Sequence, residues 1–244
     1  MNYKAVLQYD GTRYRGWQTQ GNTDNTIQGK LETLLTKMAG EPVEVNGSGR
    51  TDAGVHAAGQ VISFRCKTKE SPEEICRYMN EYLPEDIAVL SVEEAAPRFH
   101  ARLNAVRKTY VYRIWNAPVK NVFRRRFTTW IQKPLDLDAM EQAATLLCGT
   151  HDYRAFCSLK KFKKSTVRTI EKIEIGKMGQ EIRISYTGDG FLYHMVRILT
   201  GTLVEVGLGL RKPEEMTEIL EGQDRTKAGR LMPPEGLTLE SVEY

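Results

Sequence analysis

The stretch ISYTGDGFLYHMVRILTGTL, residues 184–203, joins an alternating run to a Gly-Asp-Gly turn signal and then to an apolar segment. The alternation predicts a strand that ends in a turn, and the apolar segment over 191–207 predicts a buried helix. The first half of the chain has the same order, because LQYDG at 7–11 precedes the helical pattern TIQGKLETLL at 26–35. A strand, a turn and a helix in each half predict two related α+β lobes.

Other segments agree with this class. Residues 26–39 have apolar side chains at helical spacing, and residues 71–83 begin with Ser71, Pro72 and Glu74, which together are typical of a helix N-terminus. Residues 167–190 predict a hairpin with a turn near 176–180. We therefore expect an α+β fold with a largely antiparallel sheet flanked by helices, divided into lobes at 1–115 and 116–244.

Composition limits the class of protein. In the 244 residues there is no apolar run of the roughly 18 that a membrane helix needs, and the N-terminal stretch lacks the apolar region of a signal peptide. We expect a cytoplasmic protein without membrane association. The spacing Cys148-x2-His151-x5-Cys157 lacks a fourth ligand for zinc, so buried, reduced cysteines and no metal are predicted.

Positive charge is concentrated in two segments. Residues 95–135 contain ten Lys or Arg, seven aromatic residues and no acidic residue, and residues 153–170 also lack acids while carrying six Lys or Arg. Such a separation of charge builds a positive face, for which a phosphate backbone is the usual partner. A basic surface that only contacts solvent is the alternative.

The glycine-rich stretch GSGRTDAGVHA, residues 47–57, places its charges singly on a permissive backbone. Its glycines would let a large substrate approach the carboxylate of Asp52, and in an extended segment Arg50 would point to the same side. Asp52 can therefore serve as a nucleophile or general base. The alternative is a turn in which Asp52 accepts backbone hydrogen bonds.

Several enzyme classes do not fit this stretch. The phosphate-binding pattern GxxxxGK[ST] and the dinucleotide-binding pattern GxGxxG are both missing. An aspartic protease would need a second Asp-Thr-Gly-like copy, and a zinc deaminase would need clustered His and Cys ligands. What is left is a single reactive carboxylate together with a basic, aromatic face.

Seven blocks of the sequence resemble the tRNA pseudouridine(38–40) synthase family. In chain order they are YDGTRYRGWQTQ, TIQGKLE, GRTDAGVHA, RKTYVYRI, GTHDYRAFC, GFLYHMVRILTG and PPEGLTLE, and they span residues 9 to 240. The resemblance implies a pseudouridine synthase-like fold with a central basic cleft and both lobes on one continuous sheet. It also implies a homodimeric, cofactor-free isomerase that converts uridine to pseudouridine at positions 38, 39 and 40 of the tRNA anticodon stem-loop.

The resemblance also assigns roles to single residues. Asp52 matches the catalytic aspartate, Arg50 the arginine that enters the RNA as the uridine flips out, Tyr110 the tyrosine that stacks on the target base, and Arg197 the arginine that pairs with the catalytic carboxylate. For contacts to the RNA backbone we expect the basic residues Arg124, Arg125, Arg126, Lys160 and Lys161.

Some of these residues, and the function as a whole, also have a simpler interpretation. Without the resemblance, Tyr110 is an ordinary strand aromatic that packs in the core, and His56 and His194 are structural histidines. The competing function is a non-catalytic RNA-binding module that uses the basic aromatic face, with KTYVY at 108–112 as its aromatic strand.

Overall fold

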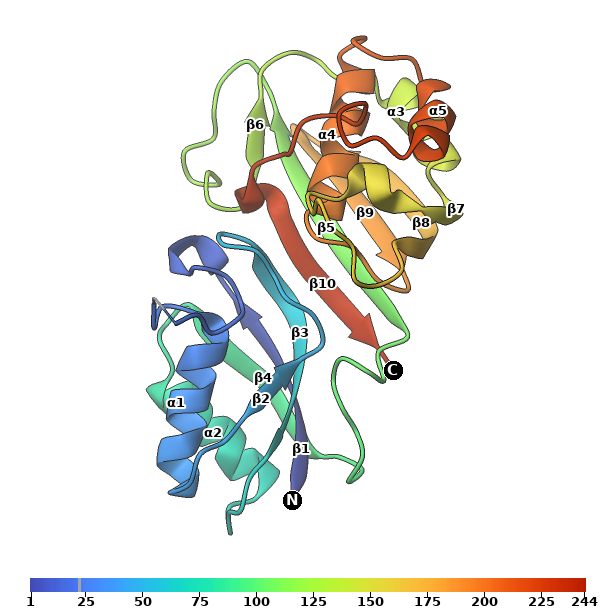
Figure 1. The fold of residues 1–244 in the computed structure, drawn as a ribbon. Helices are drawn as coiled ribbons and strands as arrows, with labels where there is room; N and C mark the ends of the chain where they lie inside the picture. Colours follow the sequence, from blue (N-terminus) through green and yellow to red (C-terminus); the bar gives the residue numbers. More distant parts are fainter. Residues whose placement is uncertain (22) are drawn as a thin grey trace. The chain divides into compact units, whose positions relative to one another are not determined.

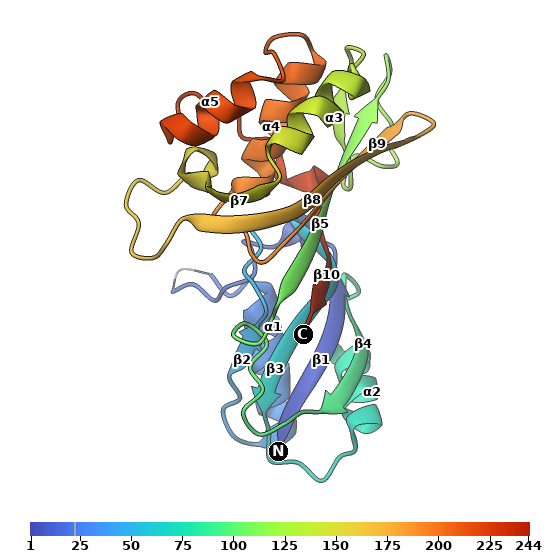
Figure 2. The same ribbon diagram turned by 90° about the vertical axis from the view of Figure 1, so that its right-hand side faces the viewer.

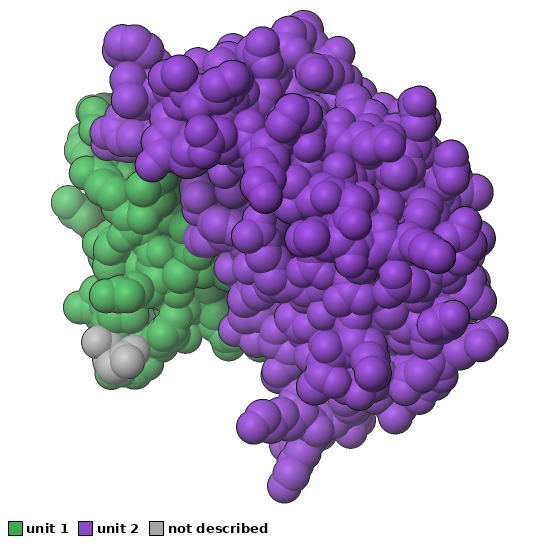
Figure 3. Space-filling model, turned by 90° about the horizontal axis from the view of Figure 1, so that it is seen from above, with its two compact units in different colours: residues 1–106, 238–244 green, residues 107–237 purple. Residues whose placement is uncertain are grey.

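The computed structural model describes residues 1–21 and 23–244 and divides the chain into two compact units. Unit 1 contains residues 1–106 together with 238–244, and unit 2 contains residues 107–237, as coloured in Figure 3. The sequence placed the border after residue 115. The contacts divide the chain at 106/107 instead, because the strand that begins at Arg107 pairs within unit 2.

Unit 1 is built on a sheet in the order β4–β1–β3–β10, and a short strand, β2, also pairs with β3. β3 is antiparallel to both β1 and β2, whereas β10 runs parallel to β3 and comes from the far end of the sequence. The strands are β1 (Asn2–Tyr9), β2 (Val45–Gly47), β3 (His56–Arg65), β4 (Ile87–Glu94) and β10 (Leu237–Glu243).

Two helices of unit 1, α1 (Ile27–Ala39) and α2 (Pro72–Tyr82), lie side by side next to this sheet (Figure 1). The side chain of Thr26 accepts a hydrogen bond from the amide of Gly29 and caps α1. Ser71 and Glu74 form a reciprocal capping box at the start of α2. Both helices predicted from the sequence are thereby confirmed.

Unit 2 has a second antiparallel ladder, in the order β5–β9–β8–β7, with the short β6 parallel to β5. The predicted hairpin at 167–190 is confirmed, and its turn lies at 179–180, where Gly179 adopts a φ of 61°. The strands are β5 (Arg107–Asn116), β6 (Thr129–Ile131), β7 (Gly149–Asp152), β8 (Val167–Met178) and β9 (Glu181–Gly188).

Three helices of unit 2 lie on one side of these strands (Figure 2). They are α3 (Leu137–Leu146), α4 (Met195–Gly207) and α5 (Glu215–Gly222). α4 is buried along almost its whole length, as predicted. The prediction that it begins at residue 191 was wrong: it begins at Met195, because His194 takes a left-handed φ of 65° that a helix cannot include.

The remaining elements are three single 3₁₀ turns, η1 (Gly11–Arg13), η2 (Tyr153–Phe156) and η3 (Pro234–Gly236). The structure confirms an α+β fold with a mostly antiparallel sheet flanked by helices. None of the described helices is both long enough and apolar enough to cross a bilayer. All four cysteines are free; Cys66 and Cys157 are buried, and Cys76 and Cys148 are half-buried.

Candidate active site

The Asp52 loop, which we define as residues 47–55, connects β2 to β3 in unit 1. Its side chains differ in exposure from one residue to the next: Ser48 and Thr51 are buried, Asp52 is half-buried and Arg50 is exposed. The loop thus anchors itself through its neutral side chains and leaves its two charged ones nearer the surface.

A main-chain turn follows Asp52. The amide of Val55 donates to the carbonyl oxygen of Asp52 at 3.1 Å, and Gly54 supplies the positive φ, 79°, that reverses the chain. This turn closes through the backbone of Asp52, so it does not require the carboxylate.

A segment near the N-terminus supports the loop from one side. The amide of Trp17 donates to the carbonyl of Thr51 at 3.0 Å, and a Cβ on Gly16 would lie 2.9 Å from that same oxygen. Gly47 faces the Trp17 ring, and a Cβ there would be 2.6 Å from a ring carbon. The expectation that Gly47 leaves room for a substrate was therefore wrong, because the space beside it is filled by the indole of Trp17.

His56 follows the Asp52 loop as the first residue of β3 and is 2% exposed. Its Nδ1 accepts a hydrogen bond from the amide of Gly11 at 3.0 Å, which ties the start of η1 to the start of β3. The same nitrogen lies 3.2 Å from a carboxylate oxygen of Asp10, so the ring also contacts the residue before η1. Both contacts hold the ring of His56 against the start of η1.

Tyr110 lies on β5 of unit 2 and is 8% exposed. Its ring meets the ring of Phe191 edge-on, with centroids 5.2 Å apart. Tyr112 lies on the same face of the strand and is fully buried. The Tyr112 hydroxyl lies 2.6 Å from the Thr129 hydroxyl and donates to the Pro233 carbonyl. Burial raises the pKa of Tyr112 far above its ordinary value. The hydroxyl of Tyr112 thus fixes its side chain in the core through two hydrogen-bonding neighbours.

Arg197 lies in the first turn of α4 and is 8% exposed. Its Nε donates to the carbonyl of Met232 at 2.7 Å, and the amide of Met232 donates back to the carbonyl of Arg197 at 3.3 Å. This reciprocal pair fixes the guanidinium to the segment that follows α5. Just before the helix, His194 Nδ1 lies 2.9 Å from the Ser158 hydroxyl, and its ring stacks on Tyr193.

The basic residues predicted to contact RNA are all exposed and all belong to unit 2. Arg124 forms an ion pair with Glu181, whose other oxygen pairs with Arg183 at 2.6 Å. Burial of Glu181 acts to raise its pKa, but the hydrogen bonds and charges of the two arginines outweigh it, so the pKa is lowered. Next to Arg124, the side chain of Phe123 is 93% exposed.

The structure thus groups Arg50 with Asp52 in unit 1, and places Tyr110 and Arg197 on β5 and α4, two elements that pack together in unit 2. Among the described residues no group of three or more His, Cys, Asp or Glu side chains could hold a metal ion. The supporting roles of Trp17 and Gly16 were missed from the sequence, although the block YDGTRYRGWQTQ was recognised.

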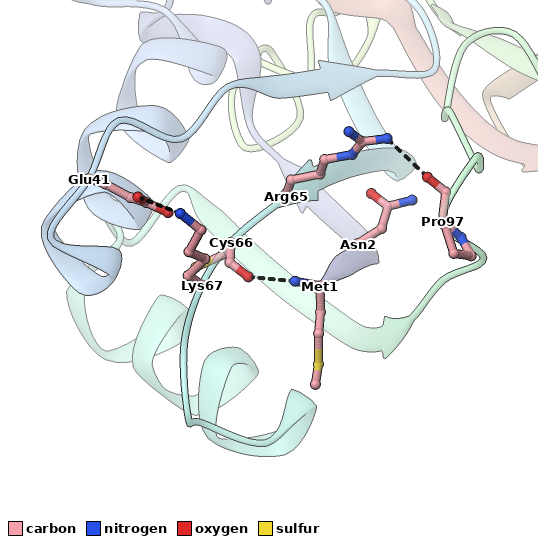
Figure 4. Close-up of a pocket in the computed structure, with 7 residues that line it drawn as sticks. All are labelled: Met1, Asn2, Glu41, Arg65, Cys66, Lys67 and Pro97. Atoms are coloured by element: carbon pink, nitrogen blue, oxygen red, sulfur yellow. Dashed lines mark hydrogen bonds and ion pairs between the residues drawn. The ribbon is translucent and has the colours of Figure 1, made fainter.

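A hollow of about 440 Å³ in unit 1 is not this site (Figure 4). Its lining includes Arg65, at the opposite end of β3 from His56, and Arg65 donates to the carbonyl of Pro97 at 3.0 Å. Lys67 pairs with Glu41 at 3.4 Å, and the Asn2 side chain donates to the carbonyls of Ala96 and Phe99, so these polar groups already have protein partners. The lining residues are Met1, Asn2, Glu41, Arg65, Cys66, Lys67 and Pro97.

Comparison with known proteins places this arrangement in a family. The family model described as "tRNA pseudouridine synthase" matches residues 5–104 and 143–244, which include Arg50, Asp52 and Arg197. The chain belongs to the tRNA pseudouridine synthase family. Tyr110 lies between the two matched segments.

Curated relatives match over the full length. The chain is 48% identical to "tRNA pseudouridine synthase A" of Bacillus sp. (strain KSM-64) over 100% of this chain and 99% of the relative. It is 44% identical to "tRNA pseudouridine synthase A 2" of Bacillus anthracis with the same coverage. A solved Cbf5–Nop10–Gar1 complex aligns with 83% of this chain and 45% of that chain, at 11% identity and a TM-score of 0.36. The assignment therefore rests on the family match and the curated relatives.

Proposed function

We propose that this chain converts uridine to pseudouridine at positions 38, 39 and 40 of the tRNA anticodon stem-loop, with Asp52 as the catalytic carboxylate. Family membership supports the reaction class. The observation that supports Asp52 is the Asp52 loop itself, which is held by main-chain and buried neutral contacts while its carboxylate is left half-buried.

The reaction is an isomerisation, so it needs neither an oxidant nor an energy source. The C1′–N1 bond breaks, the uracil turns, and a C1′–C5 bond forms while the proton of C5 is lost and N1 gains one. The Asp52 carboxylate can attack C1′ or C6, or remove the C2′ proton to give a glycal. Each of the three routes uses the Asp52 carboxylate as the reacting group, and we expect no cofactor.

The other three residues are proposed to help move the target base out of the RNA stack and to hold the site in its reactive state. Taking a paired uridine out of the stack costs a few kcal/mol. Arg50, exposed two residues before Asp52, is proposed to enter the vacated space. Tyr110 is proposed to stack on the extruded base, an interaction worth about 1–3 kcal/mol. Arg197 is proposed to pair with the catalytic carboxylate, since an opposite charge favours the ionised form.

Binding of the tRNA is proposed to use the exposed basic residues of unit 2. Phosphate contacts supply most of the non-specific affinity for a nucleic acid and make it sensitive to salt. We further propose that the protein works in the cytoplasm as a homodimer. The residues proposed to contact the RNA backbone are Arg124, Arg125, Arg126, Lys160 and Lys161.

The test is the isosteric change Asp52→Asn. We expect this variant to bind tRNA with the affinity of the unmodified protein and to form no pseudouridine, scored by carbodiimide labelling of the anticodon stem-loop. Turnover retained by Asp52→Asn would rule out the carboxylate mechanism. A pure RNA-binding module would instead show binding without turnover in both proteins, which would favour the alternative function.

A further inference from the structure

Four neutral polar side chains lie buried beneath the Asp52 loop of unit 1. Tyr9 comes from β1, Ser48 and Thr51 from the loop, and Gln60 from the middle of β3. They are 5%, 0%, 6% and 0% exposed, respectively. A buried glutamine in the otherwise small or apolar run AAGQVISF is unusual, because Gln is mostly an exposed residue.

Hydrogen bonds join the four side chains into one network. The Ser48 hydroxyl donates to Gln60 Oε1 at 2.6 Å, and Gln60 Nε2 donates to the Gly49 carbonyl at 3.0 Å. The same nitrogen lies 3.5 Å from the Tyr9 hydroxyl, which is 2.8 Å from the hydroxyl of Thr51. The amide of Gln60 therefore uses both its acceptor and its donor on the loop.

The geometry fixes which way this amide points. A carbonyl can only accept, so the group facing Gly49 must be the NH₂ end, and the oxygen end is left for Ser48. Gly49 and Thr51 flank Arg50 directly, and Asp52 is the next residue. The network thus holds the loop on both sides of Arg50 and immediately before Asp52.

The stability of the fold does not by itself require a buried hydrogen-bond network at this place. Replacing buried hydrogen-bonded partners by apolar groups of the same shape is often nearly neutral, whereas a fully satisfied network specifies one conformation. Conformation matters for a reacting group, because misplacement by about 1 Å can cost a hundredfold in rate. The network meets that requirement because it binds the residues that directly precede Asp52.

We infer that Gln60 is a positioning residue for the reaction, which sets the location of the Asp52 carboxylate by hydrogen-bonding Ser48 and Gly49 at the same time. The inference rests on the proposed role of Asp52. Gln60 lies beneath the loop and acts through its backbone.

The first test is Gln60→Met, which keeps the length of the side chain and removes both hydrogen bonds. We expect the single-turnover rate of pseudouridine formation to fall about 10- to 100-fold, while the Kd for tRNA stays within about twofold. Independently of activity, the amides of residues 48–55 should exchange with deuterium faster than in the unmodified protein.

Two further variants separate positioning from stability. Ser63→Ala removes another buried hydroxyl from β3, one that accepts from the amide of Ala101 at 3.0 Å, and serves as the matched control. It should lower the Tm while leaving the turnover rate and the exchange of residues 48–55 unchanged. The double change Gln60→Met with Ser48→Ala removes both partners of the 2.6 Å hydrogen bond, so its rate should stay as low as that of Gln60→Met alone.

The outcomes distinguish the two proposals. Slower turnover and faster loop exchange in Gln60→Met, with neither in Ser63→Ala, would support positioning. A rate that follows Tm across all the variants, or loop exchange that Gln60→Met leaves unchanged, would overturn it. If the unmodified protein forms no pseudouridine, the proposed function fails, and the exchange measurement still decides whether Gln60 fixes the loop.

Discussion

The Asp52 loop of unit 1 and the first turn of α4 in unit 2 hold the charged side chains of Asp52 and Arg197 by different means. Asp52 lies in a loop fastened by neutral side chains and main-chain bonds, and its side chain is half-buried. Arg197 is built into a buried helix and fastened through its guanidinium to the carbonyl of Met232. The loop is thus fixed by contacts of the residues next to Asp52, whereas the position in the helix is fixed in part by a donor of Arg197 itself.

Among the substitutions that test this difference between the loop and the helix, we expect Arg197→Lys to have the largest effect. A lysine keeps the charge but lacks the Nε that donates to Met232, so the cation would not be held in the same place. We expect about a hundredfold loss in single-turnover rate with tRNA affinity preserved. A rate within about threefold of the unmodified protein would show that a charge anywhere near this position is sufficient.

Next in size is Gly201→Ala, which tests how tightly α4 is packed. A Cβ at Gly201 would lie 1.9 Å from the carbonyl oxygen of Arg230, so the helix or the segment beside it must shift. We expect a loss of about 1–3 kcal/mol in the free energy of unfolding, measured by urea denaturation.

The matched control is Gly222→Ala, at the end of α5, where a Cβ meets nothing within 4 Å. Alanine there should raise stability by up to about 1 kcal/mol. Equal losses from both substitutions would mean that the tight contact of Gly201 does not decide the outcome.

A smaller effect is expected at His194, the left-handed residue before α4. Both His194→Gly and His194→Ala remove the contact with Ser158, but only alanine keeps a Cβ in a conformation that disfavours one. We expect the glycine variant to be more stable than the alanine variant by about 1 kcal/mol, as measured by thermal unfolding. The reverse order would show that the left-handed conformation is not strained.

The smallest effect expected is a dependence of stability on pH from Glu181. Its folded-state pKa is lowered by the arginines, so the unfolded chain binds the proton more tightly. The stabilisation is present above the unfolded-state pKa and is lost as the pH falls below about 4.5 and through the lowered folded value.

Glu181→Gln should therefore reduce the fall in Tm between pH 6 and pH 3, by an amount equivalent to less than about 1 kcal/mol, since both arginines are half-exposed. The neutral network under Asp52 has no carboxylate, so Gln60→Met should leave that fall unchanged. A steeper fall in Glu181→Gln would contradict the sign.

The sequence predicted the elements that depend on local signals. The helices at 26–39 and 71–83 carry their own caps, and the hairpin at 167–190 has its alternation and turn glycine within a short stretch. The start of α4 was misplaced because the apolar run continues across His194, whose left-handed conformation depends on contacts made by folding.

The parts that were missed depend on contacts between distant residues. From the sequence, Gly47 was expected to leave space for a substrate. The structure shows instead that the ring of Trp17, thirty residues earlier, packs so closely that only glycine fits at position 47. Thr238 of β10 pairs with His56 of β3, 182 residues earlier in the chain, and no local sequence pattern indicates this pairing. The charged residues of the candidate site could be predicted from their sequence motif. The buried network that includes Gln60 could not be predicted, because its members come from β1, β3 and the loop.

The parallel pairing of β10 with β3 affects when the sheet of unit 1 can be completed during synthesis. Thr238 pairs with His56 and Leu239 with Ala57, so the strand that leaves the Asp52 loop gains this neighbour only after residues 107–237 have been synthesised. At about 5–20 residues per second that interval is roughly 7–26 s. A nascent chain that already contains Asp52 still lacks the strand β10 of the sheet beside it, and the rate of synthesis sets the delay before that strand is added.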